Sequence, residues 1–421
     1  MPGLILSAPS SGAGKTTVTL GLLRVLTRRG IAVKAAKSGP DYIDPAFHAA
    51  ATGGDCVNLD AWAMAPDRLR ALAATDLPLI VEGAMGLFDG APPDGKGAVA
   101  DLARDLSLPV VLIVDAGRMA QSVAPLVAGF AGHDSRVRIG GAILNNVGSD
   151  RHERMLRRAL DPVGVPVLGV FRRDATLAHP SRHLGLVQAG ERDDLAAFLD
   201  RAADIAEASL DIPALLRLAD RGAALPATDA VRIPPPAQRI AVARDVAFAF
   251  AYPHLLADWR AAGAELSFFS PLADDRVPDA DFVYLPGGYP ELHAGRIAAA
   301  TRFLSSLRAT TAAVFGECGG YMVLGRSLTD ADGTAHAMAG LLDLTTSFAV
   351  RRRHLGYRTI TARGGPVPGR WTAHEFHYAT TTLERGEPLF DATDAEGTSL
   401  PPMGLRAGRV AGSFAHLIDR A

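Results

Sequence analysis

The sequence predicts an α/β protein of two domains, the first of them built on a doubly wound parallel sheet. At 421 residues the chain is longer than a single hydrophobic core usually organises. Up to about residue 186, short aliphatic runs alternate with longer stretches of helical periodicity, which is the pattern of βαβ units. A proline run, Pro234-Pro235-Pro236, then separates this half from a new α/β pattern that starts at Arg239.

The first half contains the strands and crossover helices that such a sheet requires. Its expected strands are short runs of aliphatic and β-branched residues, and its expected helices carry apolar residues at the spacing of one buried face. The strands are predicted at residues 4–8, 32–37, 79–81, 110–114, 140–145 and 167–170, and the helices at 17–29, 98–106 and 120–131.

The second half follows a helical stretch predicted over residues 193–221. Because consecutive prolines cannot join a helix, we expect a first domain over residues 1–222, a Pro-rich linker over 223–238 and a second domain over 239–421. In the second domain, strands are predicted at 239–243, 282–285 and 313–316, and the chain from residue 345 onward is expected to be strand-rich.

Composition and charge exclude several classes of protein. Apolar residues make up 48% of the chain and charged residues 21%, as in soluble globular proteins. A net charge of −2 offers no broad attraction to nucleic acid or an anionic membrane, and no apolar run reaches the ~18 residues of a membrane span. Cys56 and Cys318 suggest no disulfide framework, and the N-terminus lacks a secretory signal. We therefore expect a cytoplasmic protein, with a homodimer as its candidate assembly.

A phosphate-binding loop follows the first predicted strand. The segment from Ser7 to Thr17 forms a glycine-bearing turn that opens into a helix, although Pro9 replaces the first glycine of the usual pattern. Backbone N–H groups of such a loop bind phosphate oxygens, the lysine reaches the β- and γ-phosphates, and the hydroxyl that follows it can ligate Mg²⁺. The residues expected to bind ATP here are Ser10, Gly12, Ala13, Gly14, Lys15, Thr16 and Thr17.

Acidic residues follow two of the predicted strands. Because ligands of open α/β sheets collect at the carboxyl ends of the strands, these carboxylates can hold Mg²⁺ or orient a substrate. We expect Asp44 and Glu82, with Thr16, to be the metal ligands, and Asp41 and Asp89 to contact the substrate. Each of the four could instead be a turn or cap residue.

The second domain carries the elements of a thiol nucleophile site. Cys318 lies in a Gly-x-Cys-x-Gly turn between a predicted strand and a predicted helix, which is typical of a nucleophile elbow. Its position near a helix N-terminus is expected to lower the thiol pKa. Gly287 and Gly288 offer consecutive N–H groups for an oxyanion hole, and His416 supplies a base. Cys56 is expected to be structural.

Together these motifs resemble those of the cobyrinic/hydrogenobyrinic acid a,c-diamide synthases, amidotransferases of the B12 pathway. The resemblance rests on the loop from Ser10 to Thr17, on Gly39-Pro40-Asp41-Tyr42-Ile43-Asp44-Pro45, and on the segment from Val81 to Gly90. The wider group includes dethiobiotin synthetase and the division-site and partition ATPases, in which the position of Asn145 usually contacts adenine. The resemblance therefore implies a P-loop domain of dethiobiotin-synthetase type.

Residues 239–421 resemble the class I (triad) glutamine amidotransferases, which implies an α/β amidotransferase domain after the P-loop domain. The sequence departs from that class at Ile418, where an acid usually stands two residues after the histidine, so the third member of the site is either absent or supplied from elsewhere. The segment from Trp371 to Tyr378 does not have the spacing of a zinc helix, and we expect it to be a strand with His374 and His377 on opposite faces.

The resemblance implies a carbon–nitrogen ligase that uses ATP, Mg²⁺ and L-glutamine to amidate the a- and c-acetate side chains of a corrin ring. Cys318 would release ammonia from glutamine, and ATP would activate each carboxylate as an acyl phosphate. A related tetrapyrrole amidase, such as cobyric acid synthase or the nickel-sirohydrochlorin enzyme, stays an alternative, as does the choice between cobalt-free and cobalt-containing rings. An ATPase switch of the division-site type is less favoured, because its extra loop lysine would fall at Ser10.

Overall fold

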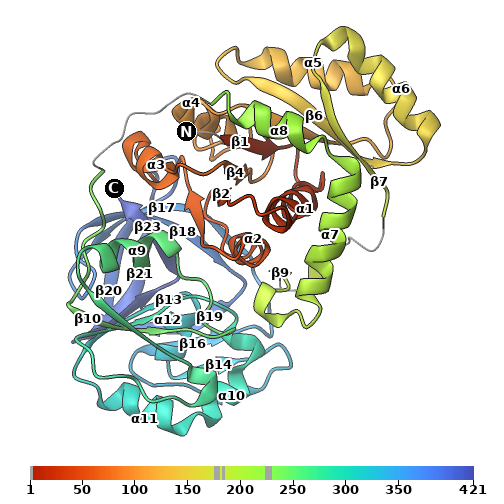
Figure 1. Ribbon diagram of the computed structural model, residues 1–421. Coiled ribbons are helices and arrows are strands. Elements are labelled where there is room, and N and C mark those ends of the chain that lie inside the picture. The colour runs from red at the N-terminus through yellow and green to blue at the C-terminus, as the bar shows by residue number, and fades with distance from the viewer. Residues whose placement is uncertain (1–2, 175–180, 183–184, 223–229) are drawn as a thin grey trace. The chain divides into compact units, whose positions relative to one another are not determined.

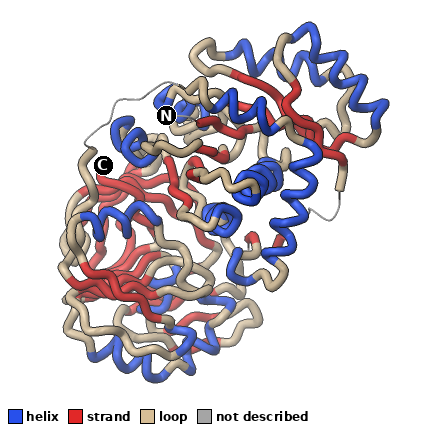
Figure 2. The backbone as a smooth tube through the Cα atoms, viewed as in Figure 1, coloured by secondary structure: helices blue, strands red, loops and turns tan. Residues whose placement is uncertain are grey.

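The computed structural model describes residues 3–174, 181–182, 185–222 and 230–421 (Figure 1). The chain divides into two compact units, Met1–Val231 and Arg232–Ala421, and each contains both helices and strands (Figure 2). The first residues of the expected linker, 223–229, lie outside the described residues. Pro234, Pro235 and Pro236 belong to the second unit, where they line a cavity.

The first unit contains a seven-stranded sheet in the order β3-β2-β4-β1-β5-β6-β7, with every neighbouring pair parallel. From the central β1 the sheet extends on one side through β4, β2 and β3 and on the other through β5, β6 and β7, so the predicted doubly wound sheet is confirmed. The strands are β1 (Gly3–Ser7), β2 (Lys34–Ser38), β3 (Cys56–Leu59), β4 (Leu79–Glu82), β5 (Val110–Asp115), β6 (Ile139–Val147) and β7 (Val167–Arg172).

Helices cover this sheet. Apolar side chains of α1, α2, α7 and α8 share one core with the sheet, in which Leu4, Leu6 and Val18 are fully buried. Helices α1 and α7 lie side by side (Figure 1), and a Cβ added to Gly21 of α1 would stand 2.7 Å from the Ala202 carbonyl of α7. The helices are α1 (Lys15–Arg28), α2 (Asp44–Thr52), α3 (Pro66–Ala73), α4 (Val99–Leu106), α5 (Val123–His133), α6 (Asp150–Leu160), α7 (Leu195–Ser209) and α8 (Ile212–Ala219).

Two sequence-based predictions for this unit need correction. The strand β3 was not predicted, because its four residues include the polar Asn58 and lack the alternation that marks a longer strand. The single helix expected over residues 193–221 is two helices that meet at Leu210 and Asp211. The carboxylate of Asp211 accepts the N–H of Ala214, and Pro213 occupies the first turn, so a new helix begins there.

The second unit contains a ten-stranded mixed sheet in the order β11-β10-β12-β13-β22-β21-β20-β17-β18-β23, and the C-terminal region is strand-rich as predicted. A four-stranded sheet has the order β15-β14-β16-β19. The strands that carry the site described below are β10 (Arg239–Ala243), β12 (Phe282–Leu285), β13 (Ala313–Glu317), β18 (Arg370–His377), β22 (Val410–Ser413) and β23 (Ala415–Arg420). The remaining elements are β11 (Glu265–Phe269), β14 (Ser327–Thr329), β15 (Ala335–Ala337), β16 (Asp343–Ser347), β17 (His354–Ala362), β19 (Thr380–Arg385), β20 (Glu387–Thr393), β21 (Ser399–Ala407), α9 (Pro253–Ala261), α10 (Ala294–Ala299), α11 (Thr301–Ala309) and α12 (Gly319–Leu324).

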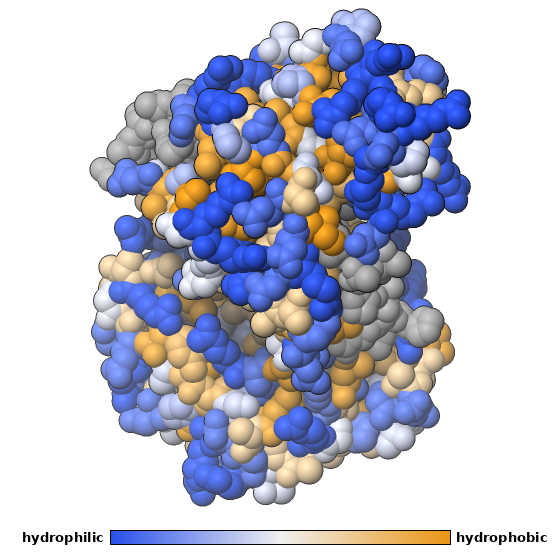
Figure 3. Space-filling model, turned by 45° about the vertical axis from the view of Figure 1, so that its right-hand side comes forward, coloured by the Kyte–Doolittle hydropathy of each residue, from blue (hydrophilic) through white to orange (hydrophobic). Residues whose placement is uncertain are grey.

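Polar and charged side chains cover much of the face seen in Figure 3, with apolar ones between them. Among the described residues, the large apolar side chains that are exposed come from separate parts of the chain, such as Met85, Val231 and Val350. No helix in the described ranges combines the length and the apolar character that crossing a bilayer would require.

Candidate active sites

The first site is built on the loop between β1 and α1. Gly12 and Gly14 adopt φ angles of 81° and 92°, which place them in the left-handed region that glycine occupies without strain. A Cβ at Gly14 would stand 2.1 Å from Nδ2 of Asn145 at the end of β6, and this amide donates a 2.9 Å hydrogen bond to the Ala13 carbonyl. The loop therefore passes tightly over β6 before it enters α1.

Lys15 extends its ammonium group back across the same loop. Its Nζ donates to the Met85 carbonyl at 2.6 Å and to the Ser10 carbonyl at 3.3 Å. Burial, followed by the positive charge of Lys37, lowers the pKa of Lys15. The ammonium thus lies between the phosphate-binding loop and the segment after β4, where two backbone carbonyls hold it.

A compact polar cluster lies beside the first turn of α1. The Thr16 hydroxyl donates to Glu82 Oε1 at 2.7 Å and lies 3.5 Å from Asp44 Oδ2. The Lys37 ammonium contacts the same two carboxylate oxygens, at 2.7 Å and 2.6 Å respectively. The structure therefore brings together the three residues expected to bind the metal and adds a buried lysine between the two carboxylates.

The ionisation of this cluster follows from burial and from the opposite charges in it. Burial alone would lower the pKa of Lys37, but Asp44 and Glu82 outweigh it and raise that pKa. Burial would raise the pKa of Glu82, but Lys37 and His48 outweigh it and lower that pKa. Burial and the nearby carboxylate of Asp41 raise the pKa of Asp44 to about 7. Glu82 and Lys37 thus form the charged core of the site.

A buried histidine supports Glu82 from the side away from the loop. His48 Nε2 lies 2.7 Å from Glu82 Oε2, and His48 Nδ1 lies 3.4 Å from the Cys56 thiol. Although burial favours the neutral ring, contacts with Cys56 and Glu82 raise the pKa of His48 to about 10. Lys37 and His48 were not among the residues predicted from the sequence. The signal available for Lys37 was a lysine near the carboxyl end of a predicted strand.

Asp41 and Asp89, expected to contact the substrate, both bond to their own loops. Asp41 Oδ1 accepts the N–H groups of Ile43 and Asp44 at 2.7 Å and 3.1 Å, and Asp89 Oδ2 accepts the N–H of Gly86 at 3.0 Å. Such bonds are typical of turns. Each carboxylate has a second oxygen that takes no part in these bonds.

The oxygen donors of the cluster fit a hard divalent cation. The Thr16 hydroxyl and one carboxylate oxygen each from Asp44 and Glu82 converge on the same side of the loop. Such oxygen donors are the ligands that Mg²⁺ prefers, and Mg²⁺ usually takes only one or two carboxylates together with phosphate oxygens and water. These residues are therefore a suitable set for a nucleotide-bound Mg²⁺.

The second site is built on the turn between β13 and α12. Cys318 has φ 46° and ψ −101°, a strained conformation for a residue other than glycine. The flanking glycines permit close backbone approach: a Cβ on Gly320 would stand 1.9 Å from the Leu285 carbonyl oxygen, and one on Gly319 would stand 3.0 Å from the Gly288 nitrogen. The geometry is that of a nucleophile elbow.

The charge state of the Cys318 thiol differs from the sequence-based expectation. Burial, with the carboxylate of Glu291 as the next contribution, raises the pKa of this thiol, whereas the sequence analysis expected the helix N-terminus to lower it. Cys318 is 4% exposed and α12 is only six residues long, so desolvation outweighs the helix terminus. The free protein therefore holds a thiol here, and any nucleophilic role requires a base that removes its proton.

His416, Gly287 and Gly288 lie at the same elbow. A Cβ on Gly287 would stand 2.3 Å from Cε1 of His416, so the imidazole packs directly against that glycine. The Cys318 N–H donates to the Ser413 carbonyl at 2.8 Å, which ties the nucleophile to the segment that precedes His416. Burial, followed by the charges of His374 and His377, lowers the pKa of His416 to about 3, so the ring is neutral and can act as a base.

Glu317, the residue before the nucleophile, also reaches His416, and the sequence analysis did not select it. Its Oε2 lies 3.7 Å from His416 Nδ1 and accepts the Tyr284 hydroxyl at 2.8 Å. The signal available in the sequence was a charged residue at the end of an apolar strand.

The strand predicted for the segment from Trp371 to Tyr378 is present as β18, which spans Arg370–His377. His354, Glu375 and His377 bring one ligand atom each within 4.8 Å of one another. However, the two imidazole rings are stacked with an interplanar angle of 4°, so their in-plane lone pairs run parallel and do not converge on one ion. Glu375 is also paired with Arg358 at 2.7 Å. This arrangement is structural rather than a metal centre.

These two sites define the class of the protein. Residues 4–187 match the CobQ/CobB/MinD/ParA nucleotide-binding domain, and residues 239–420 match the CobB/CobQ-like glutamine amidotransferase domain. The chain thus joins a nucleotide-binding domain to a glutamine amidotransferase domain. A solved glutamine amidotransferase covers 37% of the chain at 17% identity and a TM-score of 0.26, which is too little to bear on the fold.

Full-length relatives identify the particular family. The chain is 58% identical over 433 residues to a hydrogenobyrinate a,c-diamide synthase of Sinorhizobium sp, which covers 100% of this chain and 99% of the relative. A protein of the same name from Brucella anthropi is 55% identical, over 100% of this chain and 99% of its own length. Another from Mesorhizobium japonicum is 52% identical, over 99% of this chain and 98% of its own length. The chain belongs to the hydrogenobyrinate a,c-diamide synthase family.

Proposed function

We propose that this protein amidates the a- and c-acetate carboxylates of hydrogenobyrinic acid, using ATP and glutamine, in cobalamin biosynthesis. The observation that carries this conclusion is the full-length likeness to relatives named for that substrate, across both the nucleotide-binding and the amidotransferase domain. The cobalt-free ring is favoured over cobyrinic acid, because the relatives described above are named for hydrogenobyrinate.

The first unit is proposed to activate the carboxylate. A carboxylate oxygen of the substrate attacks the γ-phosphorus of ATP, which forms an acyl phosphate and releases ADP. Lys15 and the loop N–H groups from Gly12 to Thr17 bind the phosphates, with Ser10 at the entry of the loop and Asn145 on the adenine. Thr16, Asp44 and Glu82 would hold Mg²⁺, which neutralises phosphate charge when bound.

The remaining polar groups of this unit are proposed to place the ring. Asp41 and Asp89 each have a carboxylate oxygen to offer to it, and Lys37 lies between the two carboxylates of the cluster. Ammonia then attacks the acyl phosphate, phosphate leaves, and the carboxamide remains.

The second unit is proposed to supply the ammonia. The thiol of Cys318 loses its proton to His416 and attacks the glutamine carboxamide, while the N–H groups of Gly287 and Gly288 stabilise the oxyanion. Ammonia leaves as the thioester forms, and water then hydrolyses the thioester to glutamate. Because burial keeps Cys318 in the thiol form, this attack requires the buried imidazole of His416 to accept the thiol proton.

We further propose domain limits at 1–222 and 239–421 with a linker between them, and a cytoplasmic location in which Cys318 stays reduced. Both cysteines are free thiols. A homodimer is the assembly to test first, by sedimentation equilibrium of the full chain.

The decisive experiment compares two nitrogen donors. Cys318→Ser and His416→Ala are expected to lose synthesis from glutamine and to keep synthesis from ammonium, because the ammonia source and the ligase lie in different units. Wild-type protein is assayed with hydrogenobyrinic and cobyrinic acid, ATP-Mg²⁺ and each donor, and added amides are counted by mass spectrometry. Normal use of glutamine by Cys318→Ser would refute the assignment of the nucleophile.

The same assay separates the alternative functions. A different tetrapyrrole amidase would leave both corrin rings unchanged while it consumes glutamine and ATP with its own substrate. An ATPase switch would hydrolyse ATP without regard to glutamine or ring. Two amides added to hydrogenobyrinic acid, and none without ATP, is the result that the proposed function requires.

A further inference from the structure

We propose that Glu317 is the positioning carboxylate of the glutaminase site, which holds the imidazole of His416 in the orientation and tautomer that accept the thiol proton of Cys318. This rests on the proposed hydrolysis of glutamine. The class usually takes this acid from the second residue after the histidine, but that residue is Ile418, which is fully buried among apolar side chains. Glu317, the residue directly before Cys318, instead places its carboxyl group beside Nδ1 of His416.

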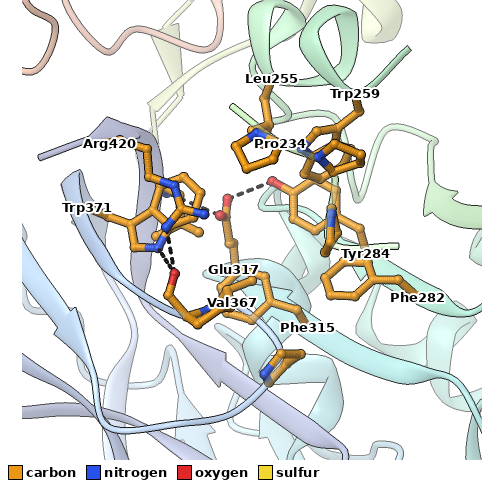
Figure 4. A pocket seen from close by; sticks show the side chains of 15 residues that line it. Pro234, Leu255, Trp259, Phe282, Tyr284, Phe315, Glu317, Val367, Trp371 and Arg420 are labelled. Atoms are coloured by element: carbon orange, nitrogen blue, oxygen red, sulfur yellow. Dashed lines mark hydrogen bonds between the residues drawn. The ribbon is translucent and has the colours of Figure 1, made fainter. Parts of the chain in front are cut away.

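The local structure places the carboxyl group beside the histidine. Glu317 is the last residue of β13, and the alternation of the strand puts its side chain on the same face as that of Phe315. Both residues line a cavity of about 210 Å³ together with Tyr284 and Trp371 (Figure 4). The carboxyl group thus borders a mostly apolar cavity, and the residue is 1% exposed.

Three contacts orient the carboxyl group. Oε1 accepts the N–H of Leu417 at 3.1 Å, and Oε2 accepts the Tyr284 hydroxyl at 2.8 Å. The same Oε2 lies 3.7 Å from Nδ1 of His416. Because Leu417 directly follows His416, one carboxyl group contacts both the backbone beside the histidine and its ring. The 3.7 Å separation exceeds a hydrogen bond, and such catalytic contacts often tighten only when substrate binds.

A purely structural role would not call for an acid here. Burying a carboxyl group in an apolar cavity is costly. An amide would avoid that cost: its oxygen could accept the Leu417 N–H while its N–H donated to the Tyr284 hydroxyl oxygen. An amide, however, has no anionic oxygen with which to accept a hydrogen bond from Nδ1–H of His416. We therefore infer that the energetic cost of burying the Glu317 carboxyl group is offset by its role in orienting the imidazole of His416.

The chemistry follows from the two nitrogens of the ring. When Nδ1–H donates to the Glu317 carboxylate, the lone pair of Nε2 is free to take the thiol proton as the sulfur–carbon bond forms. The ring becomes an imidazolium that the carboxylate stabilises, and the proton leaves again with the ammonia. Burial raises the pKa of Glu317 to about 8, so the ionised fraction of the protein carries this role, and that fraction grows as the pH rises toward 8. Glutamine at this position would donate its own N–H to Nδ1, which moves the ring proton to Nε2 and blocks the base.

The other acid close to the histidines is already engaged. Glu375 is paired with Arg358 at 2.7 Å and with His377 at 3.0 Å, so its charge is taken up by those groups. His374 lies opposite His416 in the register of β18 and β23, but an imidazole has no fixed negative charge with which to hold an imidazolium. Among the described residues, Glu317 is thus the acid placed to position the base.

The test uses Glu317→Gln and Tyr284→Phe in the full-length protein. The chain offers a matched control in the Tyr321–Glu384 pair, where a tyrosine hydroxyl also donates to a glutamate at 2.7 Å but no histidine is involved. Glu384→Gln is therefore measured in parallel. Glutaminase kcat and KM, ammonium-dependent synthesis, and the ¹⁵N shifts of His416 in histidine-labelled protein are the readouts.

Glu317→Gln is expected to lower glutaminase kcat by at least about 10²-fold, toward the ~10⁴-fold loss known for an amide at this place in a triad. KM and ammonium-dependent synthesis should stay within about twofold of wild type, and His416 should shift from the Nδ1–H to the Nε2–H tautomer. Tyr284→Phe keeps the charge but loses one of the orienting contacts, so an intermediate loss of kcat is expected. Glu384→Gln should match wild type.

Glutaminase kcat of Glu317→Gln within about twofold of wild type, or an unchanged His416 tautomer, would overturn the positioning role. A loss of ammonium-dependent synthesis equal to the loss of glutaminase would show a folding defect, and Tyr284→Phe, whose carboxylate remains, then decides: wild-type kcat there would overturn the role. If the wild-type protein had no glutaminase activity, the proposed function would fail first.

Discussion

The hydroxyl of Thr16 donates a 2.7 Å hydrogen bond to Oε1 of Glu82 and so joins the phosphate-binding loop to the end of β4. The two residues are 66 positions apart in the chain, but β1 and β4 are adjacent parallel strands whose carboxyl ends meet at the same edge of the sheet. A nucleotide bound to the loop would therefore meet the acidic residues at its phosphate end. The predictions for the first unit follow from this contact.

Glu82→Gln is expected to slow both amidations by at least about 10²-fold with either nitrogen donor, because it removes the charge that balances Lys37 and faces Thr16. Half-saturation should also require more Mg²⁺. Time-resolved mass spectrometry with ammonium as donor measures both effects. Glu207→Gln, which breaks the exposed ion pair with Arg29, is the control and should match wild type. Normal rates in Glu82→Gln would exclude a role at the phosphates.

Lys15→Ala is expected to abolish synthesis from both glutamine and ammonium but to leave glutaminase activity. Its ammonium bridges the carbonyls of Ser10 and Met85 and lies where the transferred phosphate must be stabilised, whichever donor follows. Glutamate release and amide formation are measured in the same reaction. Wild-type synthesis from ammonium in this variant would contradict a phosphate-binding loop.

Asp89→Asn is expected to let the first amidation proceed and to slow the second, so that a monoamide accumulates. Asparagine can still accept the Gly86 N–H, so the loop is preserved while the charge is lost. The a- and c-side chains must be presented in two different poses, and a displacement of ~1 Å can cost about 10²-fold in the less favourable pose. The time course of mono- and diamide by mass spectrometry tests this. Equal slowing of both steps would refute discrimination by Asp89.

Gly287→Ala is expected to reduce glutaminase activity by at least about 10-fold and to spare synthesis from ammonium. The new Cβ would stand 2.3 Å from Cε1 of His416, so the imidazole must leave its present place beside Gly287. Gly295→Ala is the matched control, because a Cβ there meets only the His336 ring at an ordinary 3.5 Å. If both variants hydrolysed glutamine equally well, the position assigned to His416 would be wrong.

Glu317→Gln is expected to stabilise the second unit relative to wild type, and to do so more strongly at pH 8 than at pH 5. Burial raises the pKa of Glu317 from 4.5 to about 8, against the hydrogen bonds from Tyr284 and Leu417. The folded state therefore favours the protonated carboxyl group, and wild-type stability falls as the pH rises from 4.5 to about 8. An amide does not ionise, so the difference should grow across that window to the order of a few kcal/mol.

The measurement for this last prediction is urea unfolding at pH 5, 6.5 and 8. The second unit contains Trp259 and Trp371, whose fluorescence reports its transition. His416 and Tyr284 are the titratable groups that contact Glu317, and Arg420 lines the same cavity. A stability difference that is constant between pH 5 and pH 8 would contradict a buried carboxyl group with a raised pKa.

The sequence by itself determined the parts of this protein that depend on neighbouring residues. The phosphate-binding loop, the elbow around Cys318 and most strands follow from short patterns, because glycine, proline and apolar periodicity act over a few residues. The doubly wound sheet follows from the order of those elements, since parallel strands joined by helices allow few arrangements. Local patterns did not predict the short strand β3, and they did not reveal that the capping residue Asp211 divides the expected helix into two.

Tertiary structure alone decided how the polar groups are paired and charged. Sheet register brings Lys37, Glu82 and His48 together, although no short motif links them, and it places Glu317 against His416 across 99 residues. Burial then reverses the expected charge of Cys318, because desolvation outweighs a short helix terminus. Burial is a property of the packed chain rather than of any residue. The ionisation of both sites, and the contact that makes Glu317 the proposed substitute for the acid missing at Ile418, could therefore appear only once the strands were assembled.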